Sequence, residues 1–391
     1  MDLKERIGKL SPQARKALQS KLLTEPKIDN DNHNLDFSIF FFSDRAGNEE
    51  DKYSLLLECA KYADTNGFHA IWVPERHFHE FGALYPSPSV LLAAISMITK
   101  NLKLNSGSIV LPLHHPVRVA EEWSMLDNLS KGRAGLSIAS GWNKADFILS
   151  NVSYDNRKPS MFDSIELIKQ LWAGEKLSFS DHDNNNSTIE IYPKPVQKEL
   201  PLWITSSANP QTWISAGKMG ANVLSGLMEQ TTEQIAANIL LYRNALKENG
   251  FSHTHGKVTV MLHTYIDDNL EKAKETVKPA LMNYFRNHLS LYERQVNNAQ
   301  NANIDLNLIT NQDKETLIEH GFERYFNHSS LLGNIDSGQN MIKKLKNIGI
   351  DEIACLINFG LEDELILKGL EKLKILKDLT NTVTVKNIVS E

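Results

Sequence analysis

Short apolar segments alternate along the chain with longer segments in which apolar residues recur every three or four positions. The short segments are rich in β-branched and aromatic residues. Several are apolar without strict alternation, as expected for strands that are covered on both faces. From this pattern we predict strands at residues 35–42, 69–74, 102–111, 134–139, 201–205, 221–225, 257–266 and 351–357.

The longer segments have the period of amphipathic helices. Residues 116–130, for example, begin with Pro116, a favoured first-turn residue, and place Val119 and Trp123 on one stripe. Eight strands that alternate with about eight helices predict a (β/α)8 TIM barrel, with a doubly wound open sheet as the alternative. The helices are expected at residues 50–66, 116–130, 161–173, 210–218, 233–248, 268–290, 337–348 and 363–378.

Three segments interrupt this alternation. Residues 1–31 contain a polar helix and form an N-terminal extension or linker before the barrel domain, which we place at residues 35–380 and follow with a tail at 381–391. Residues 174–200 contain a turn-rich tip between two strand-like segments and predict a hairpin insertion. Residues 291–330 are polar, and a long connection late in a barrel is a candidate active-site lid.

Composition narrows the class of protein. The 391 residues include 42 Lys and Arg against 48 Asp and Glu, a net charge of −6, which argues against a nucleic-acid or anionic-membrane partner. Cys59 and Cys355 lie in apolar stretches and predict two buried reduced thiols rather than a disulfide or a metal site. The first ten residues lack a secretory apolar core, and no apolar run is long enough to span a membrane. We therefore expect a soluble, cytoplasmic, globular protein.

The second predicted strand ends in a cluster of charged and imidazole side chains. Glu75, Arg76, His77, His79 and Glu80 follow it within six positions. A solvated loop is the simpler interpretation, but the C-terminal strand ends of a parallel barrel are where active sites lie. A histidine side chain titrates near neutral pH, so His77 is a candidate acid or base. Two histidines alone are weak support for a metal site.

Three further strand ends carry small or hydrogen-bonding residues. Gly107 lies within the third strand, where a glycine marks a bulge, a close packing contact or the approach of a planar ligand. Residues 140–142 follow the fourth strand and suit a ligand wall or ordinary packing. Asn209 and Pro210 predict a capped helix start after the fifth strand, and its N–H groups favour an anion such as phosphate. Together these ends favour a planar cofactor that bears a phosphate.

The residues that carry this chemistry resemble a known family. The stretch at 67–147 resembles bacterial luciferases and the wider luciferase-like flavin-dependent monooxygenases, and the likeness continues through residues 161–175, 201–225, 262–277 and 323–360. The motifs SGWN, SSANPQTW and EIACLINFG resemble the branch associated with nonribosomal peptide and polyketide biosynthesis.

The resemblance implies a TIM barrel that binds reduced FMN, supplied by a separate flavin reductase, and reacts with O2 through a C4a-hydroperoxyflavin. A cis peptide bond is expected between Gly107 and Ser108. Tyr154 and Arg157 are expected in a loop that closes on the ribityl-phosphate end. The remaining implied flavin contacts are Gly107, Ser108, Ser140, Gly141 and Trp142, and the implied phosphate contacts are Ser206, Ser207, Asn209, Gln211 and Thr212.

The chain departs from luciferases in two places. Luciferases have two consecutive histidines where this chain has Arg76 and His77, and an arginine where it has Ser140. These departures argue against light emission and aldehyde chemistry. We assign His77 to proton exchange and Arg76 to a substrate carboxylate or carrier phosphate. Glu75 either joins this catalytic group or pairs with Arg76 to shape the loop.

The resemblance leads to a functional hypothesis with two rivals. We expect hydroxylation or N-oxygenation of an amino-acid- or polyketide-derived intermediate, free or tethered to a carrier protein. The rivals are a non-catalytic FMN-binding protein and an oxidoreductase that uses the deazaflavin F420. A homodimer is expected because the helices beside the second and third strands pair subunits in luciferases. Residues 6–23 resemble linker helices that follow carrier proteins in peptide synthetases.

Overall fold

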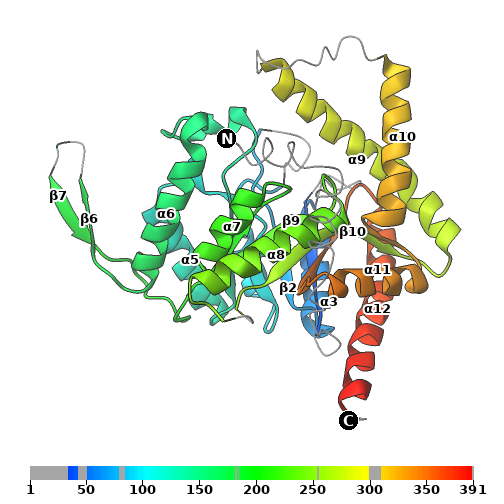
Figure 1. The fold of residues 1–391 in the computed structure, drawn as a ribbon. Coiled ribbons are helices and arrows are strands. Elements are labelled where there is room, and N and C mark those ends of the chain that lie inside the picture. The colour runs from blue at the N-terminus through cyan, green and yellow to red at the C-terminus, as the bar shows by residue number, and fades with distance from the viewer. Residues whose placement is uncertain are drawn as a thin grey trace, which may run out of the picture.

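The computed structural model describes residues 34–42, 51–78, 84–180, 183, 185–252, 255–298 and 310–389. Within these ranges, parallel strands form a closed barrel surrounded by helices (Figure 1). The expected extension at residues 1–31 lies outside the described residues. The last helix continues without a break past residue 380.

The barrel closes because its first and last strands pair in register. Ile39 of β1 lies opposite Ile71 of β2 on one side and Cys355 of β12 on the other. The order around the barrel is β1-β2-β3-β5-β8-β9-β10-β12, and the β10–β9 pairing rules out the open doubly wound sheet. The predicted TIM barrel is confirmed. Its strands are β1 Asp36–Phe41, β2 Ala70–Val73, β3 Lys103–Ser106, β4 Ile109–Val110, β5 Ala134–Ala139, β8 Leu202–Thr205, β9 Asn222–Gly226, β10 Val258–Ile266 and β12 Glu352–Asn358.

The third predicted strand is divided in two. Its N-terminal part, β3, pairs with both β2 and β5, and the short β4 continues the pairing with β5 after a break at Gly107–Ser108. A further short strand, β11 Leu331–Gly333, pairs with β10 outside the barrel and was not predicted.

Eight helices occupy the predicted positions, and two others in the described ranges, α4 Pro88–Ser96 and α10 Asn311–His328, were not predicted. The segment at Pro88–Ser96 forms α4, which the sequence pattern did not reveal because it is short and apolar on most positions rather than striped. Pro88 at its first turn is the signal that could have identified it. The helices are α3 Ser54–Thr65, α4 Pro88–Ser96, α5 Pro116–Ser130, α6 Arg157–Trp172, α7 Pro210–Lys218, α8 Thr232–Glu248, α9 Leu270–Asn298, α10 Asn311–His328, α11 Ile335–Asn347 and α12 Asp363–Val389.

The hairpin insertion is confirmed, and the second insertion differs from expectation. Strands β6 Leu177–Ser180 and β7 Asn186–Ile189 pair antiparallel and project from the body of the molecule (Figure 1). The predicted polar connection at 291–330 is largely helical, since α9 runs to Asn298 and α10 occupies Asn311–His328.

The polar sequence of this insertion has a physical reason. Side chains of α9 and α10 join across the two helices as ion pairs, with Lys274 Nζ 2.8 Å from Glu323 Oε2 and Arg286 Nη2 2.8 Å from Glu315 Oε2. Charged residues therefore mark a helix–helix contact here, not an irregular loop. A lid role for the segment remains a prediction.

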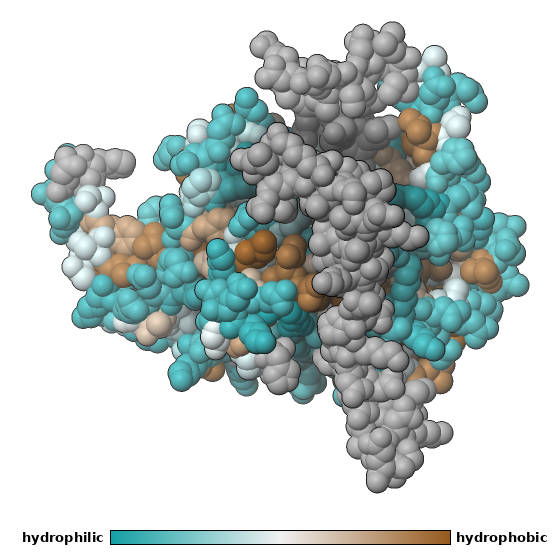
Figure 2. Space-filling model, viewed as in Figure 1, coloured by the Kyte–Doolittle hydropathy of each residue, from teal (hydrophilic) through white to brown (hydrophobic). Residues whose placement is uncertain are grey.

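The barrel interior is filled by side chains. At its N-terminal end the buried carboxylate of Glu352 accepts hydrogen bonds from Ser38, Trp72 and Thr259. Cys59 and Cys355 are free and buried, as predicted. The face in Figure 2 is mainly hydrophilic with separate apolar patches. Of the helices in the described ranges, none is sufficiently long and apolar to cross a bilayer.

Candidate active site

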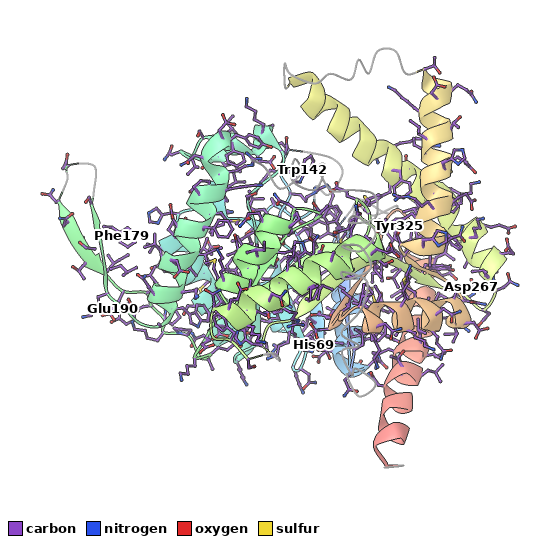
Figure 3. The ribbon with its side chains drawn as sticks, in the orientation of Figure 1. His69, Trp142, Phe179, Glu190, Asp267 and Tyr325 are labelled. Atoms are coloured by element: carbon purple, nitrogen blue, oxygen red, sulfur yellow. The ribbon has the colours of Figure 1, made fainter. Side chains whose placement is uncertain are left out.

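The predicted site residues lie at one rim of the barrel. The strands β2, β3, β5 and β8 are successive neighbours, so their C-terminal ends meet at the edge where parallel barrels place active sites. Trp142, just after β5, and His69, just before β2, lie toward opposite ends of the barrel (Figure 3).

Glu75 is the buried centre of a cluster at this rim. Its Oε1 lies 2.8 Å from His77 Nε2 and 2.7 Å from His114 Nε2, and its Oε2 accepts from the backbone N–H of Val110 at 2.6 Å. An ionised carboxylate can only accept, so both imidazoles donate through Nε2. Among the described residues no group of His, Cys, Asp and Glu is arranged to hold a metal ion.

The cluster holds opposite charges close together. Burial alone would raise the pKa of Glu75, but hydrogen bonds from His114 and His77 outweigh it and leave this pKa below its usual value. Burial alone would lower the pKa of His114, but the hydrogen bond and charge of Glu75, with a smaller effect of Glu122, raise it above its usual value. The sequence left open whether Glu75 pairs with Arg76, and the structure gives the carboxylate three other partners.

Arg76 lies against two aromatic rings. Its guanidinium carbon is 4.4 Å from the ring centroid of Phe42 and 5.6 Å from that of Trp142, distances typical of cation–π contacts. Asp146 lies nearby: burial raises its pKa, although protonation of His77, the hydrogen bond from Asn143 and the charge of Arg76 would each lower it. The rim therefore carries a second acidic side chain, which sequence reasoning missed.

Gly107, at the break between β3 and β4, is closely packed. A Cβ atom on Gly107 would lie 2.7 Å from a ring carbon of Phe40 and 3.3 Å from Trp72 Cβ, so no larger residue fits without movement. The sequence left packing and ligand approach open for this glycine, and the structure supports packing. The Gly107–Ser108 peptide bond is cis, as the resemblance implies.

Three hydroxyl groups meet beside this break. Ser108 Oγ is hydrogen-bonded to Thr205 Oγ1 and lies 3.1 Å from Ser137 Oγ, which in turn is 2.9 Å from Thr205 Oγ1. The three residues come from the β3–β4 connection, β5 and β8. They form a compact set of hydrogen-bond donors and acceptors from three neighbouring strands.

Tyr154 and Arg157 hold the turn after β5. The Tyr154 hydroxyl donates to the Trp142 carbonyl at 2.9 Å, and Arg157 Nε donates to the Gly141 carbonyl at 3.1 Å. The guanidinium carbon of Arg157 is 3.8 Å from the Tyr154 ring centroid. These two residues, which we expected in a closing loop, thus fix the backbone beside Ser140 and Trp142.

The helix start after β8 has the predicted cap. Asn209 Oδ1 accepts from the Gln211 N–H at 3.0 Å, so the side chain of Asn209 already occupies one N–H group of α7. Ser207 and Gln211 are exposed, Thr212 is half-buried and Ser206 is buried. These hydroxyl and amide groups at a helix N-terminus suit a phosphate without a basic residue.

Four residues of this rim were not found from the sequence: His114, Asp146, Ser137 and Thr205. His114 could have been suspected, because it follows the third strand within Leu-Pro-Leu-His-His-Pro at the same rim. His79 and Glu80, which we included in the charged cluster, lie outside the described residues.

The family profile described as luciferase-like monooxygenase matches residues 35–351, most of the barrel. The chain belongs to this family. The predictions of a luciferase-like relationship and of an enzyme of the flavin-dependent monooxygenase class are therefore confirmed at the level of the family.

Individual relatives are distant but extensive. The oxygenase component of flavin-dependent trigonelline monooxygenase from Acinetobacter baylyi is 24% identical over 353 residues, 86% of this chain and 93% of that protein. The oxygenating constituent of 3,6-diketocamphane monooxygenase from Pseudomonas putida, solved with FMN, has a TM-score of 0.68 at 16% identity and covers 87% of this chain and 97% of its own.

A structure with a different cofactor is comparably similar. An F420-dependent secondary alcohol dehydrogenase in complex with an F420–acetone adduct has a TM-score of 0.65 at 16% identity, and the match covers 88% of this chain and 98% of that one. The likeness of fold therefore does not choose between FMN and F420.

Proposed function

We propose that this luciferase-like monooxygenase is the oxygenase component of a two-component system that uses reduced FMN and O2. When bound, reduced FMN would supply two electrons to O2, so that one oxygen atom enters the substrate and the other leaves as water. A separate flavin reductase supplies the reduced flavin. The trigonelline relative, named as an oxygenase component, supports this division of labour.

The observation that carries the proposal is the arrangement of one rim around a planar, phosphate-bearing guest. Ser108, Ser137 and Thr205 offer hydroxyl groups for a polar ring edge. The exposed start of α7 at Asn209 offers hydrogen-bond groups for a phosphate. The Gly141–Trp142 turn, held by its hydrogen bonds to α6 and the short helix before it, would form a wall between them.

The chemistry is assigned to the cluster around Glu75. His77, bonded to Glu75, exchanges a proton with the reacting groups through the ring nitrogen that Glu75 leaves open. Arg76, oriented by Phe42 and Trp142, binds an anionic group of the substrate. Glu75 fixes the histidines and does not react itself.

For the substrate we propose an amino-acid- or polyketide-derived intermediate of natural-product biosynthesis, free or bound to a carrier protein. The support is the likeness of SGWN at 140–143 and SSANPQTW at 206–213 to that branch of the family. Carbon hydroxylation and N-oxygenation are both compatible with the site.

A homodimer is part of the proposal. The helices α4 and α5 adjoin β2, β3 and β5. Val90 of α4, Met97 just after it, and Met125 and Leu129 of α5 are exposed. Burial of these side chains against a second copy would stabilise a dimer. Light scattering of the purified chain should give twice the monomer mass, and a monomer at micromolar concentration would contradict this part.

Cofactor binding provides the first test. Photoreduced FMN, reduced riboflavin and reduced F420 are titrated anaerobically into the purified chain. We expect reduced FMN to bind more tightly than riboflavin, because only FMN carries a phosphate for the start of α7. Stronger binding of F420 would favour the deazaflavin alternative.

Oxygen transfer provides the second test. Candidate substrates are incubated with FMN, a flavin reductase, NADH and 18O2. We expect one labelled oxygen atom in the product and reduced release of H2O2. Rapid NADPH oxidation without a reductase would contradict the two-component system. Flavin binding without any oxygen transfer across the substrate set would favour the non-catalytic alternative.

A further inference from the structure

Two imidazoles share a single oxygen atom of Glu75. His77 Nε2 and His114 Nε2 lie 2.8 and 2.7 Å from Oε1, although the residues come from different strand ends. The Glu75 side chain is 1% exposed, that of His77 is 12% exposed and that of His114 is 35% exposed. The carboxylate is therefore shielded from water and depends on these two rings for compensation of its charge.

The arrangement fixes which ring nitrogens remain for chemistry. Each imidazole donates its Nε2–H to the carboxylate, so each keeps Nδ1 for another partner. A buried carboxylate stabilises one imidazolium beside it strongly, but two imidazolium ions on one oxygen atom repel each other. The two histidines therefore compete for a single additional proton.

We propose that His114 is a positioning residue that carries this additional proton, and that it thereby keeps His77 neutral with Nδ1 available as a base. The assignment rests on the proposed role of His77 in the monooxygenase reaction. His114 is the better site because it is the more exposed of the two and because Glu122 of α5 also favours its charged form. In this assignment the positive charge that compensates Glu75 lies on His114, and His77 contributes only a neutral hydrogen bond.

The charged groups around the two histidines are compatible with a protonated His114 and a neutral His77. Glu75 faces both rings from the end of β2, and Arg76 follows it in the chain. Glu122 approaches His114 from α5, and Asp146 approaches His77 from the short helix after β5. Burial raises the pKa of Asp146, so this carboxyl favours a charged His77 less than a fully ionised one would.

The test follows the histidine rings directly by NMR. The full, flavin-free chain is labelled with 15N and 13C in histidine, and the His77 and His114 signals are assigned by comparison with His77→Ala and His114→Ala. At neutral pH we expect His77 as the Nε2–H tautomer and His114 as the doubly protonated ring.

Three variants then separate charge from packing. His114→Ala removes the ring, and His114→Gln keeps a side-chain donor without the charge. In both, Glu75 acts on His77 alone, so protonation of His77 should move to higher pH by at least about 0.5 unit, about threefold in proton affinity. His115→Gln is the matched control, because His115 is the neighbouring imidazole and contacts Phe179 rather than Glu75. His115→Gln should leave the pH at which His77 is protonated unchanged.

The outcomes are distinct. An unchanged His77 titration in His114→Gln, with folding verified by circular dichroism, would overturn the proposal, as would a neutral His114 at pH 7. If the protonation of His77 moves to higher pH in His114→Ala but not in His114→Gln, His114 acts only as a hydrogen-bond donor, and the proposal is also overturned. Since the measurement needs no flavin, a failure of the proposed FMN function would appear in the cofactor titration and not here.

Discussion

Replacing Glu75 by glutamine tests whether one buried carboxylate stabilises both the fold and the proposed catalytic group. Glu75→Gln keeps the size of the side chain and removes its charge. In the native protein the carboxylate accepts from His77, His114 and the Val110 N–H. A glutamine amide has one acceptor oxygen, so it cannot serve all three donors.

The expected loss of stability follows from these contacts. Hydrogen bonds to a charged group contribute about 1.5–3 kcal/mol each, and removal of one partner from a buried ion pair costs about 3–5 kcal/mol. These two energies describe partly the same contacts, so they do not add. The loss is also reduced because glutamine keeps one acceptor oxygen and because water reaches His114. We therefore expect Glu75→Gln to lower the free energy of unfolding by about 2–4 kcal/mol near pH 5.5.

The pH dependence is the decisive part. The pKa of Glu75 is lowered in the folded protein, so its contribution is present above the unfolded value and is lost as pH falls through the folded value. The pKa of His114 is raised, so its contribution is present below the unfolded value and is lost as pH rises through the folded value. The difference between native and variant proteins should be largest between these limits and should decrease on both sides.

Urea unfolding followed by circular dichroism at about pH 4, 5.5 and 8.5 measures this difference. Glu315→Gln is the control, because Glu315 pairs with Arg286 on the surface, where an ion pair contributes little to stability. A difference for Glu75→Gln that is constant with pH, or no larger than that of the control, would refute the reasoning.

Three further predictions address packing, the cofactor and the chemistry. Gly107→Ala should lower the free energy of unfolding by about 1–3 kcal/mol, because the new Cβ would contact Phe40. Gly321→Ala on α10 is the control: a Cβ there meets nothing, so the free energy of unfolding should rise by up to about 1 kcal/mol. Equal effects of the two substitutions in thermal unfolding would contradict the packing argument. Asn209→Ala should destabilise α7 by about 1 kcal/mol and reduce the difference in affinity between FMN and riboflavin. If fluorescence titration gives an unchanged ratio of the two dissociation constants, the phosphate does not bind at this helix. His77→Ala should lower turnover by roughly 10²–10⁴-fold with FMN affinity nearly unchanged, and normal turnover with lost FMN affinity would move His77 to the cofactor site.

Most of the fold follows from local sequence patterns, and the exceptions depend on distant contacts. The strand patterns identify every strand position of the barrel, because parallel strands covered on both faces are continuously apolar. The close packing that requires glycine at the break in the third strand involves Phe40, whose ring reaches Gly107 from β1. The end of α9 and the whole of α10 were hidden in a polar segment because charged residues of the two helices pair with each other rather than with solvent alone.

The candidate site shows the same limit. Glu75, Arg76 and His77 are adjacent in the chain, so a strand end with unusual charge was sufficient to select them. His114 is 39 positions from Glu75 and binds the same oxygen atom as His77, a relationship that exists only after the fold brings the ends of β2 and β4 together. No pattern within one segment contains that information.

The position of Glu75 also determines how mutational data on this rim must be interpreted. Its backbone N–H donates to the Ser108 carbonyl at 3.0 Å, and its side chain accepts from the Val110 N–H, so the same residue holds both sides of the break that adjoins the hydroxyl cluster. Loss of activity in a Glu75 variant would therefore follow equally from a displaced histidine and from a displaced Gly107–Ser108 connection. Neither backbone contact of Glu75 involves His114, and His114→Gln removes the charge that the carboxylate meets while it keeps a side-chain donor. For this reason His114, and not Glu75, is the residue at which the proton chemistry of the cluster can be separated from the shape of the barrel.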